Sequence, residues 1–277
     1  MKTWRRLTIP YLVWGTVMLL LPMLLIVFYS LIQPGNEVTT FRVTLANFIR
    51  FFTDKDFLLI LVRSLTIALK TTLLCLVIGY PIAYWISRCS ARMQNVLIMM
   101  ITLPMWINML VRTYAWIGIL SEGGPLSIVL GWFGIHTEIL YTETAVLIGM
   151  VYNFLPYMIL QIHTSLTKMD PSLVEAANDL GASPFQTFWR VIFPLSLPGV
   201  ISGVTLVFLP AISAFFIPKL LGGGSWFLIG NVIENQFITV GEWNFGSAIS
   251  VIMAMVMMLL MTLVRKADRK GAKGGKA

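Results

Sequence analysis

The chain has 277 residues, of which 57% are hydrophobic and only 12% are charged. A mean hydropathy of +0.83 is far too high for a soluble domain and predicts an all-α integral membrane protein. The net charge of +8 does not indicate a nucleic-acid-binding protein, because the basic residues lie beside apolar spans instead of forming a patch on a polar fold.

The first span is predicted at about residues 9–32, after a basic start at residues 1–8. The apolar run is long enough to cross a bilayer and no small-residue cleavage site follows it, which favours a transmembrane helix over a cleaved signal peptide. Residues 33–63 turn polar and should lie outside, with a short interfacial helix at 45–52. A second span is expected at 64–86, with Lys70 in its outer half.

Further apolar runs predict a third span at 96–120 and a fourth at 144–162, separated by a glycine-rich outer loop. Cys75 and Cys89 lack metal-ligand spacing, so we interpret both as free and structural.

A polar segment follows the fourth span, and its residues are typical of two short, capped helices. Asp170 and Pro171 supply an N-cap and a first helical residue, and Gly181 is expected to end that helix. The second helix should begin with a capping box of Ser183 and Gln186 and end at Pro194. Helical spacing places four apolar side chains on one stripe of it: Phe185, Phe188, Trp189 and Ile192. Taken without further information, the segment is equally typical of an interfacial loop packed on its own protein.

The remaining elements are a fifth span at about 197–218, a sixth at 245–264 and a basic tail, residues 265–277, expected to be disordered. Residues 9–264 thus form one six-helix domain. With this topology thirteen Lys and Arg residues lie on the side of the capped segment and five on the other, namely Arg42, Arg50, Lys55, Arg63 and Lys219. The positive-inside rule therefore places both termini and the capped loop, residues 164–196, in the cytoplasm.

Catalytic and metal-binding motifs are missing from the sequence. No GxxxxGK[ST] phosphate loop follows a predicted strand, and no Ser or Cys lies in a nucleophile motif. His136 and His163 fall on opposite sides of the predicted membrane, which argues against a metal site made from both. We predict a chain that is not an enzyme and binds no metal or cofactor itself.

Polar and aromatic residues inside the spans are then the candidates for function. Asn108 and Arg112 are four residues apart on the third span, although Arg112 is also typical of a side chain that snorkels to the interface. Asn153 on the fourth span suits a kink or a helix contact equally well. The predicted translocation pathway comprises Trp106, Asn108, Arg112, Tyr114, Asn153, Phe215, Phe216 and Glu234.

The segment EAANDLGAS, with FWRVIFPLSLPGV after it, resembles the EAA loop of ATP-binding cassette importer permeases. The resemblance implies that this loop docks on a cytoplasmic ATPase through Glu175, Ala176, Ala177, Gly181, Ser183, Pro184, Phe185, Phe188 and Trp189. Together with LPMWINMLVRTYAW, LIGNVIENQF and EWNFGSAIS, it resembles the first permease subunit of bacterial spermidine/putrescine importers.

That resemblance implies a type I importer permease fold with six transmembrane helices in the bacterial inner membrane. It implies a second permease, a dimer of ATPase subunits that bind ATP and Mg, and an extracytoplasmic binding protein. One feature departs from a cation route, since the predicted spans hold Arg112 and no carboxylate. Another small solute, such as an opine or an amino acid derivative, is the alternative cargo, and a stand-alone secondary transporter is a further alternative.

Overall fold

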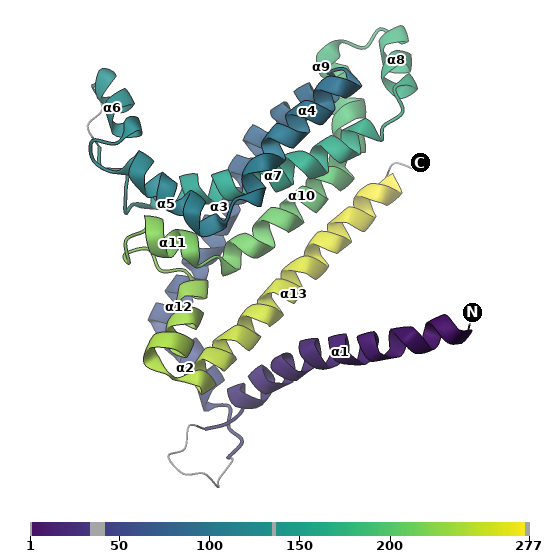
Figure 1. The fold of residues 1–277 in the computed structure, drawn as a ribbon. Coiled ribbons are helices and arrows are strands. Elements are labelled where there is room, and N and C mark those ends of the chain that lie inside the picture. The colour runs from purple at the N-terminus through teal and green to yellow at the C-terminus, as the bar shows by residue number, and fades with distance from the viewer. Residues whose placement is uncertain (1, 34–41, 135–136, 275–277) are drawn as a thin grey trace. The chain divides into compact units, whose positions relative to one another are not determined.

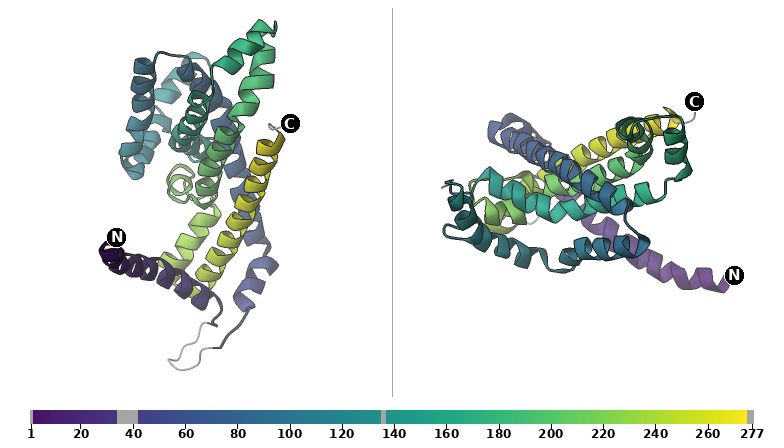
Figure 2. Two further views of the ribbon diagram at one scale, coloured as in Figure 1. Left: turned by 90° about the vertical axis from the view of Figure 1, so that its right-hand side faces the viewer. Right: turned by 90° about the horizontal axis from the view of Figure 1, so that it is seen from above.

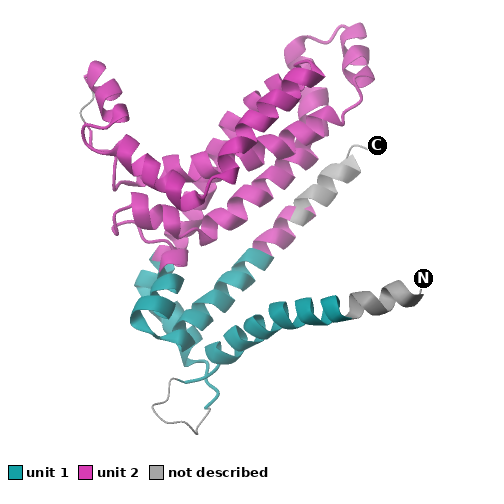
Figure 3. Cartoon of the chain, in the orientation of Figure 1, with its two compact units in different colours: residues 1–59, 232–258 teal, residues 60–231, 259–277 magenta. Residues whose placement is uncertain are grey.

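The computed structural model describes residues 2–33, 42–134 and 137–274, and the side chains of residues 10–33, 42–134, 137–264 and 266. Within these ranges the regular elements are helices, apart from one isolated antiparallel bridge between Ile32 and Val43. The chain divides into two compact units, residues 1–59 with 232–258 and residues 60–231 with 259–277 (Figure 3).

Figure 1 labels the helices in chain order. They are α1 (Lys2–Ser30), α2 (Ala46–Thr53), α3 (Lys55–Ser87), α4 (Ala91–Thr102), the 3-10 helix η1 (Leu103–Trp106), α5 (Met109–Leu120), α6 (Pro125–Trp132), α7 (Glu143–Thr167), α8 (Ser172–Asp179), α9 (Pro184–Thr187), the π-helix η2 (Phe188–Ile192), α10 (Phe193–Ser213), α11 (Phe216–Leu221), α12 (Ile229–Asn235), the π-helix η3 (Gln236–Val240) and α13 (Trp243–Gly274).

Among the described residues, five helical stretches are long and apolar enough to cross a membrane: Pro10–Ser30, Lys55–Ser87, Glu143–Thr167, Pro184–Ser213 and Trp243–Val264. A sixth span results if the bent pair Ala91–Trp106 and Met109–Trp132 is counted as one. The all-helical membrane fold predicted from composition is thus confirmed.

In unit 1, two side-chain amides link α2 and α13 to carbonyl groups at the end of α1. The Asn47 amide donates to the Ser30 and Ile32 carbonyls, each at 3.1 Å, and the Asn244 amide donates to the Tyr29 and Ile32 carbonyls at 3.1 and 3.0 Å. These bonds satisfy carbonyl groups that the end of α1 leaves without intrahelical partners. The short helix expected near residues 45–52 is present as α2.

Unit 2 is built on the packing of α7 against α10, two helices that lie side by side (Figures 1 and 2). Gly199 and Gly203 face α7 so closely that a Cβ on Gly199 would lie 2.4 Å from the Ser165 Cβ. A Cβ on Gly203 would lie 2.6 Å from the Met158 sulfur. The GxxxG pattern is therefore a packing seam, as small residues at four-residue spacing indicate in membrane helices.

The predicted third span is not one helix. The axis bends by 94° between α4–η1 and α5–α6. Pro104 cannot donate a backbone hydrogen bond, and the chain leaves the helical region at Ile107 and Asn108, whose ψ angles are 139° and 134°. A hydropathy profile does not reveal this break, because the residues on both sides of it are predominantly apolar.

Several predicted boundaries also differ. Helix α3 begins at Lys55, nine residues before the expected start of the second span at Ser64. Helix α13 continues to Gly274, so the tail predicted to be disordered is helical up to that residue. The fifth span ends at Ser213, and α11 follows as a separate helix.

Residues 229–240, expected as part of an outer loop, form α12 and η3 instead. The buried Asn231 explains part of this difference within unit 2. Its amide donates to the Phe215 carbonyl at 2.8 Å, and its side-chain oxygen accepts from the Leu228 backbone N–H at 3.1 Å. The Ile229 N–H donates to the Ser64 hydroxyl at 2.8 Å. The bonds to Phe215 and Ser64 join residues 16 and 165 positions apart, so local sequence patterns do not show them.

Candidate functional site

The segment between α7 and α10 enters α8 one residue later than predicted, because the helix begins at Ser172 with Pro171, and not Asp170, at the N-cap position. Asp170 still provides a side-chain hydrogen bond at this end of the helix. One Asp170 side-chain oxygen accepts from the Ser172 backbone N–H at 3.0 Å. The Ser172 backbone N–H, and after it the Ser172 hydroxyl, hold the pKa of the exposed Asp170 carboxyl below its ordinary value. The carboxylate is therefore charged at neutral pH, and its contribution at the start of α8 is lost only as the pH falls through this lowered pKa.

Gly181 ends α8 as predicted, in a Schellman arrangement. Its φ of +78° lies in the left-handed region, which a glycine adopts without strain. The Gly181 N–H donates to the Asn178 carbonyl at 2.9 Å, and the Ala182 N–H donates to the Ala177 carbonyl at 3.1 Å. The turn that follows the EAA residues is thus fixed by local hydrogen bonds.

The second helix has the predicted capping box. The Gln186 N–H donates to the Ser183 hydroxyl at 3.3 Å, and the Ser183 N–H donates to the Gln186 side chain at 3.0 Å. A further contact of 3.4 Å joins the Thr187 hydroxyl to the Asn178 side-chain oxygen. This contact links α8 directly to α9.

Pro194 does not end the second helix, which corrects the prediction. The helix runs from α9 through the π-helix η2 into α10, and the Phe193 N–H donates to the Phe188 carbonyl five residues earlier. A proline ring normally clashes with the carbonyl four residues before it. The wider π turn lies at that carbonyl and accommodates the ring, so the short helix is continuous with a membrane span.

The apolar stripe predicted on this helix is divided between two environments. Ile192 is buried, and Phe188 packs partly buried against the core of unit 2, with its ring 5.7 Å from the rings of both Tyr80 and Tyr84. Phe185 is instead 72% exposed, and Leu180 at the end of α8 is 89% exposed. We call the exposed group Leu173, Leu180, Phe185 and Trp189 the apolar tip.

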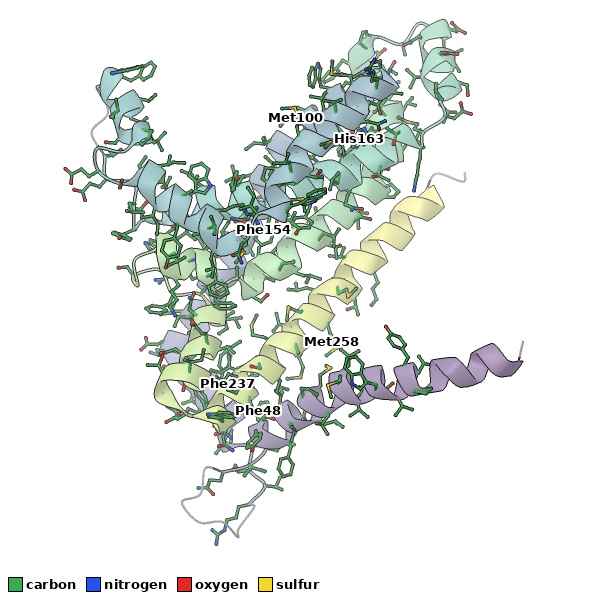
Figure 4. All side chains as sticks on the ribbon, in the orientation of Figure 1. Phe48, Met100, Phe154, His163, Phe237 and Met258 are labelled. Carbon is green, nitrogen blue, oxygen red and sulfur yellow. The ribbon has the colours of Figure 1, made fainter. Side chains whose placement is uncertain are left out.

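A cavity of about 430 Å³ lies between α8 and the neighbouring ends of three longer helices. It is lined by the end of α3, the start of α4 and the end of α7, and it includes Arg88, Asp170 and Glu175. Gln94 also lines the cavity, and its side-chain oxygen lies 3.3 Å from the Nε2 of His163 on α7, which links α4 to α7; Figure 4 labels His163. Glu175 and Ala176 of the EAA motif are exposed to solvent, and Ala177 is half-buried.

The candidate pathway residues of the bent span do not share one helical face. Asn108 is the N-cap of α5, where its side-chain oxygen accepts from the Leu110 N–H at 2.8 Å. Arg112 does not snorkel fully to solvent, because its Nε and Nη1 atoms are buried and donate no hydrogen bond within the described residues. Its guanidinium lies 6.0 Å from the ring centre of Tyr152 on α7.

The other candidates are dispersed. Trp106 is 87% exposed and Tyr114 is 61% exposed, as aromatic residues of a membrane interface would be. Asn153 is buried and donates to the Gly149 carbonyl at 2.9 Å, while its side-chain oxygen has no partner among the described residues. Phe215 and Phe216 lie at the start of α11, with ring centres 4.1 Å apart and ring planes tilted by 33°. Glu234 belongs to unit 1, on α12.

An ion pair inside the spans was missed by sequence reasoning. Lys70 on α3 pairs with Glu143, the first residue of α7. The apolar helices hold carboxylates that the predicted spans did not, because α7 begins at Glu143, one residue before the expected Thr144, and α3 begins at Lys55 and includes Asp56. Lys70 lies in the outer half of the second predicted span, and Glu143 comes directly before the outer end of the fourth. Their opposite charges at the same predicted depth could have indicated the pair.

Neither cysteine forms a disulfide, in agreement with the prediction; Cys75 is buried and Cys89 is half-buried. In the part of the chain that the structure describes, no group of three or more His, Cys, Asp or Glu is placed to hold a metal ion. His136 lies outside the described residues, so its placement on the opposite side of the membrane from His163 stays a prediction.

Comparison with known proteins decides what kind of membrane protein this is. The family model described as the binding-protein-dependent transport system inner membrane component matches residues 75–269. The chain belongs to this family of permeases.

The permease is 39% identical over 260 residues to the spermidine/putrescine transport system permease protein PotB of Escherichia coli K12, covering 92% of this chain and 94% of that one. It is 38% identical to PotB of Haemophilus influenzae, again over 92% of this chain and 91% of that one. The crystal structure of a bacterial alginate ABC transporter, in complex with an alginate-pentasaccharide-bound periplasmic protein, contains a chain that matches with a TM-score of 0.76 at 16% identity. The match covers 97% of the permease and 94% of that chain. The ABC importer permease fold expected from the EAA loop is confirmed.

Proposed function

We propose that this permease carries polyamines of the spermidine and putrescine type across a bacterial inner membrane. The observation that carries the proposal is the identity with spermidine/putrescine permeases along nearly the whole chain. The aromatic side chains among the candidate pathway residues, such as Phe215 and Phe216, suit this cargo, since contacts of ammonium groups with aromatic rings contribute about 0.5–2 kcal/mol each.

The energy source in this proposal is a separate ATPase dimer, which would bind ATP and Mg. The permease sequence has no phosphate loop of its own. The capped segment offers a docking element, because α8 and α9 are joined to each other and continue through η2 into α10. The residues proposed to contact the ATPase are the exposed ones of this segment, namely Glu175, Ala176, Gly181, Ser183, Pro184, Phe185 and Trp189. Ala177 and Phe188 would hold them in place.

Alternating access is the mechanism that fits this arrangement. Closure of the ATPase dimer would move α8 and α9, and α10 would pass the movement to α7 through the Gly199–Gly203 seam. A second permease would complete the pathway, and an extracytoplasmic binding protein would deliver the cargo. The excess of basic residues on the side of the capped segment supports cytoplasmic termini. For a trivalent polyamine a membrane potential of 100 mV favours entry by about 7 kcal/mol, so the ATPase mainly enforces direction.

Uptake of labelled spermidine by the source organism tests the proposed cargo. Deleting the gene should abolish uptake that depends on the binding protein, and restoring it should recover that uptake. Unlabelled putrescine should compete with the label, whereas an opine or an amino acid in equal excess should not. Spermidine uptake that is unchanged by the deletion, or competition by the amino acid alone, would contradict the proposal.

A further inference from the structure

We propose that Glu143 is a specificity-determining carboxylate that binds a terminal ammonium group of the amine cargo, and that Lys70 occupies this carboxylate when no cargo is present. This inference rests on the proposed polyamine cargo and adds the residue that recognises it. It also supplies the carboxylate that a cation route needs within the spans.

The position of Glu143 suits a residue that meets cargo. It is the first residue of α7, and α8 follows the other end of that helix. The 25 residues of α7 separate the two ends by about 36 Å. If the capped segment faces the ATPase, Glu143 faces the side from which a binding protein delivers cargo. The Glu143 side chain is 29% exposed and that of Lys70 is 48% exposed, so water and small cations reach the pair.

The chemistry of Lys70 is that of the cargo. A lysine side chain is four methylenes ending in a primary ammonium, which is also the aminobutyl end of putrescine and spermidine. Glu143 therefore already binds an aminobutyl ammonium, held by its attachment to α3. Partly exposed ion pairs contribute little to stability, so replacing the Lys70 ammonium by an ammonium of the cargo costs little free energy.

An apolar groove continues from the pair along the same helix faces. Leu74 and Leu147 follow Lys70 and Glu143 by four residues, and both line a cavity of about 410 Å³. Methylene groups next to a bound ammonium would lie against these side chains without loss of hydrogen bonds. Thr144 lines the cavity at the Glu143 end.

The far part of the groove is aromatic and carries a positive charge beside it. Trp116 and Tyr152 meet edge to face with ring centres 5.3 Å apart, and the Arg112 guanidinium lies 6.0 Å from the Tyr152 ring centre. The Arg112 charge repels a second ammonium from that end. The groove thus accepts one ammonium at Glu143 with its adjoining methylenes, and the other ammonium groups of the cargo remain on the Glu143 side.

Steady-state uptake of labelled spermidine by the complete transporter, in cells that carry variants of the chromosomal gene, tests the assignment. Glu143→Gln should raise the KM for spermidine by about two- to fivefold, the range expected when a partly exposed ion pair loses its negative charge. Lys70→Met should lower the KM or leave it unchanged, because it removes the competitor. The double variant should resemble Glu143→Gln. Glu122→Gln, on an exposed loop residue, is the matched control, and membrane abundance is measured for each variant.

A purely structural ion pair gives a different pattern. In that case both single variants lose abundance or uptake and the double variant recovers it, which would overturn the assignment. An unchanged KM in Glu143→Gln would overturn it as well while leaving the polyamine cargo intact. If the wild-type transporter takes up no spermidine, the proposed function fails and the subsite falls with it.

Discussion

Replacing Leu180 and Phe185 together with aspartate is expected to abolish uptake while the permease itself still folds. Both side chains are among the most exposed apolar residues of the apolar tip, so the change removes no contact with the core of unit 2. A partner surface that covers the tip would have to bury two unpaired carboxylates, which costs several kcal/mol. The ATPase should therefore no longer co-purify with the detergent-solubilised permease.

The control for this double change is Leu263→Asp on α13, a residue that is also exposed but remote in sequence from the tip. It should disturb membrane insertion without a selective loss of the ATPase. Normal recovery of the ATPase with the Leu180→Asp, Phe185→Asp variant would show that the tip is not the docking surface.

Phe188→Ala is expected to lower the stability of the permease, because Phe188 belongs to the core of unit 2 and not to the apolar tip. The Phe188 ring contacts Tyr80, Tyr84 and Phe193 in the core that joins α3, η2 and α10. Removing a packed aromatic side chain leaves a cavity and costs about 3 kcal/mol. The thermal unfolding midpoint of the purified permease should fall by about 5–10 °C.

Phe185→Ala is the matched comparison, because Phe185 lies three residues earlier on the same segment and is mostly exposed. Its unfolding midpoint should stay close to that of the wild type, while its affinity for the ATPase decreases. Equal midpoints for the Phe188→Ala and Phe185→Ala variants would contradict the division of the predicted stripe into a buried and an exposed part.

The features that sequence reasoning predicted well are those fixed by neighbouring residues. The Ser183–Gln186 capping box, the Asp170–Ser172 hydrogen bond and the stop at Gly181 depend on hydrogen bonds that span five residues or fewer. The membrane spans follow from composition over about twenty residues, which hydropathy measures directly.

The features that were missed depend on contacts or on backbone geometry beyond that range. Pro194 is a helix-ending signal by itself, but the helix continues past it through the π turn, and α10 also continues past Pro198 and Pro210. Helical spacing groups Phe185 with Phe188, but it does not state which side chain meets the protein's own core and which meets a partner. The Lys70–Glu143 pair joins residues 73 positions apart, so it requires the parallel packing of two helices to be known.

Cysteine labelling at the apolar tip tests the central claim most directly. In a Cys89→Ser background, Phe185→Cys is treated with a membrane-impermeant maleimide in spheroplasts and in inside-out vesicles. Labelling is expected only in inside-out vesicles, and it should decrease when the ATPase is bound. Efficient labelling in intact spheroplasts would place the tip on the outer face and would contradict its role as the docking site for the ATPase.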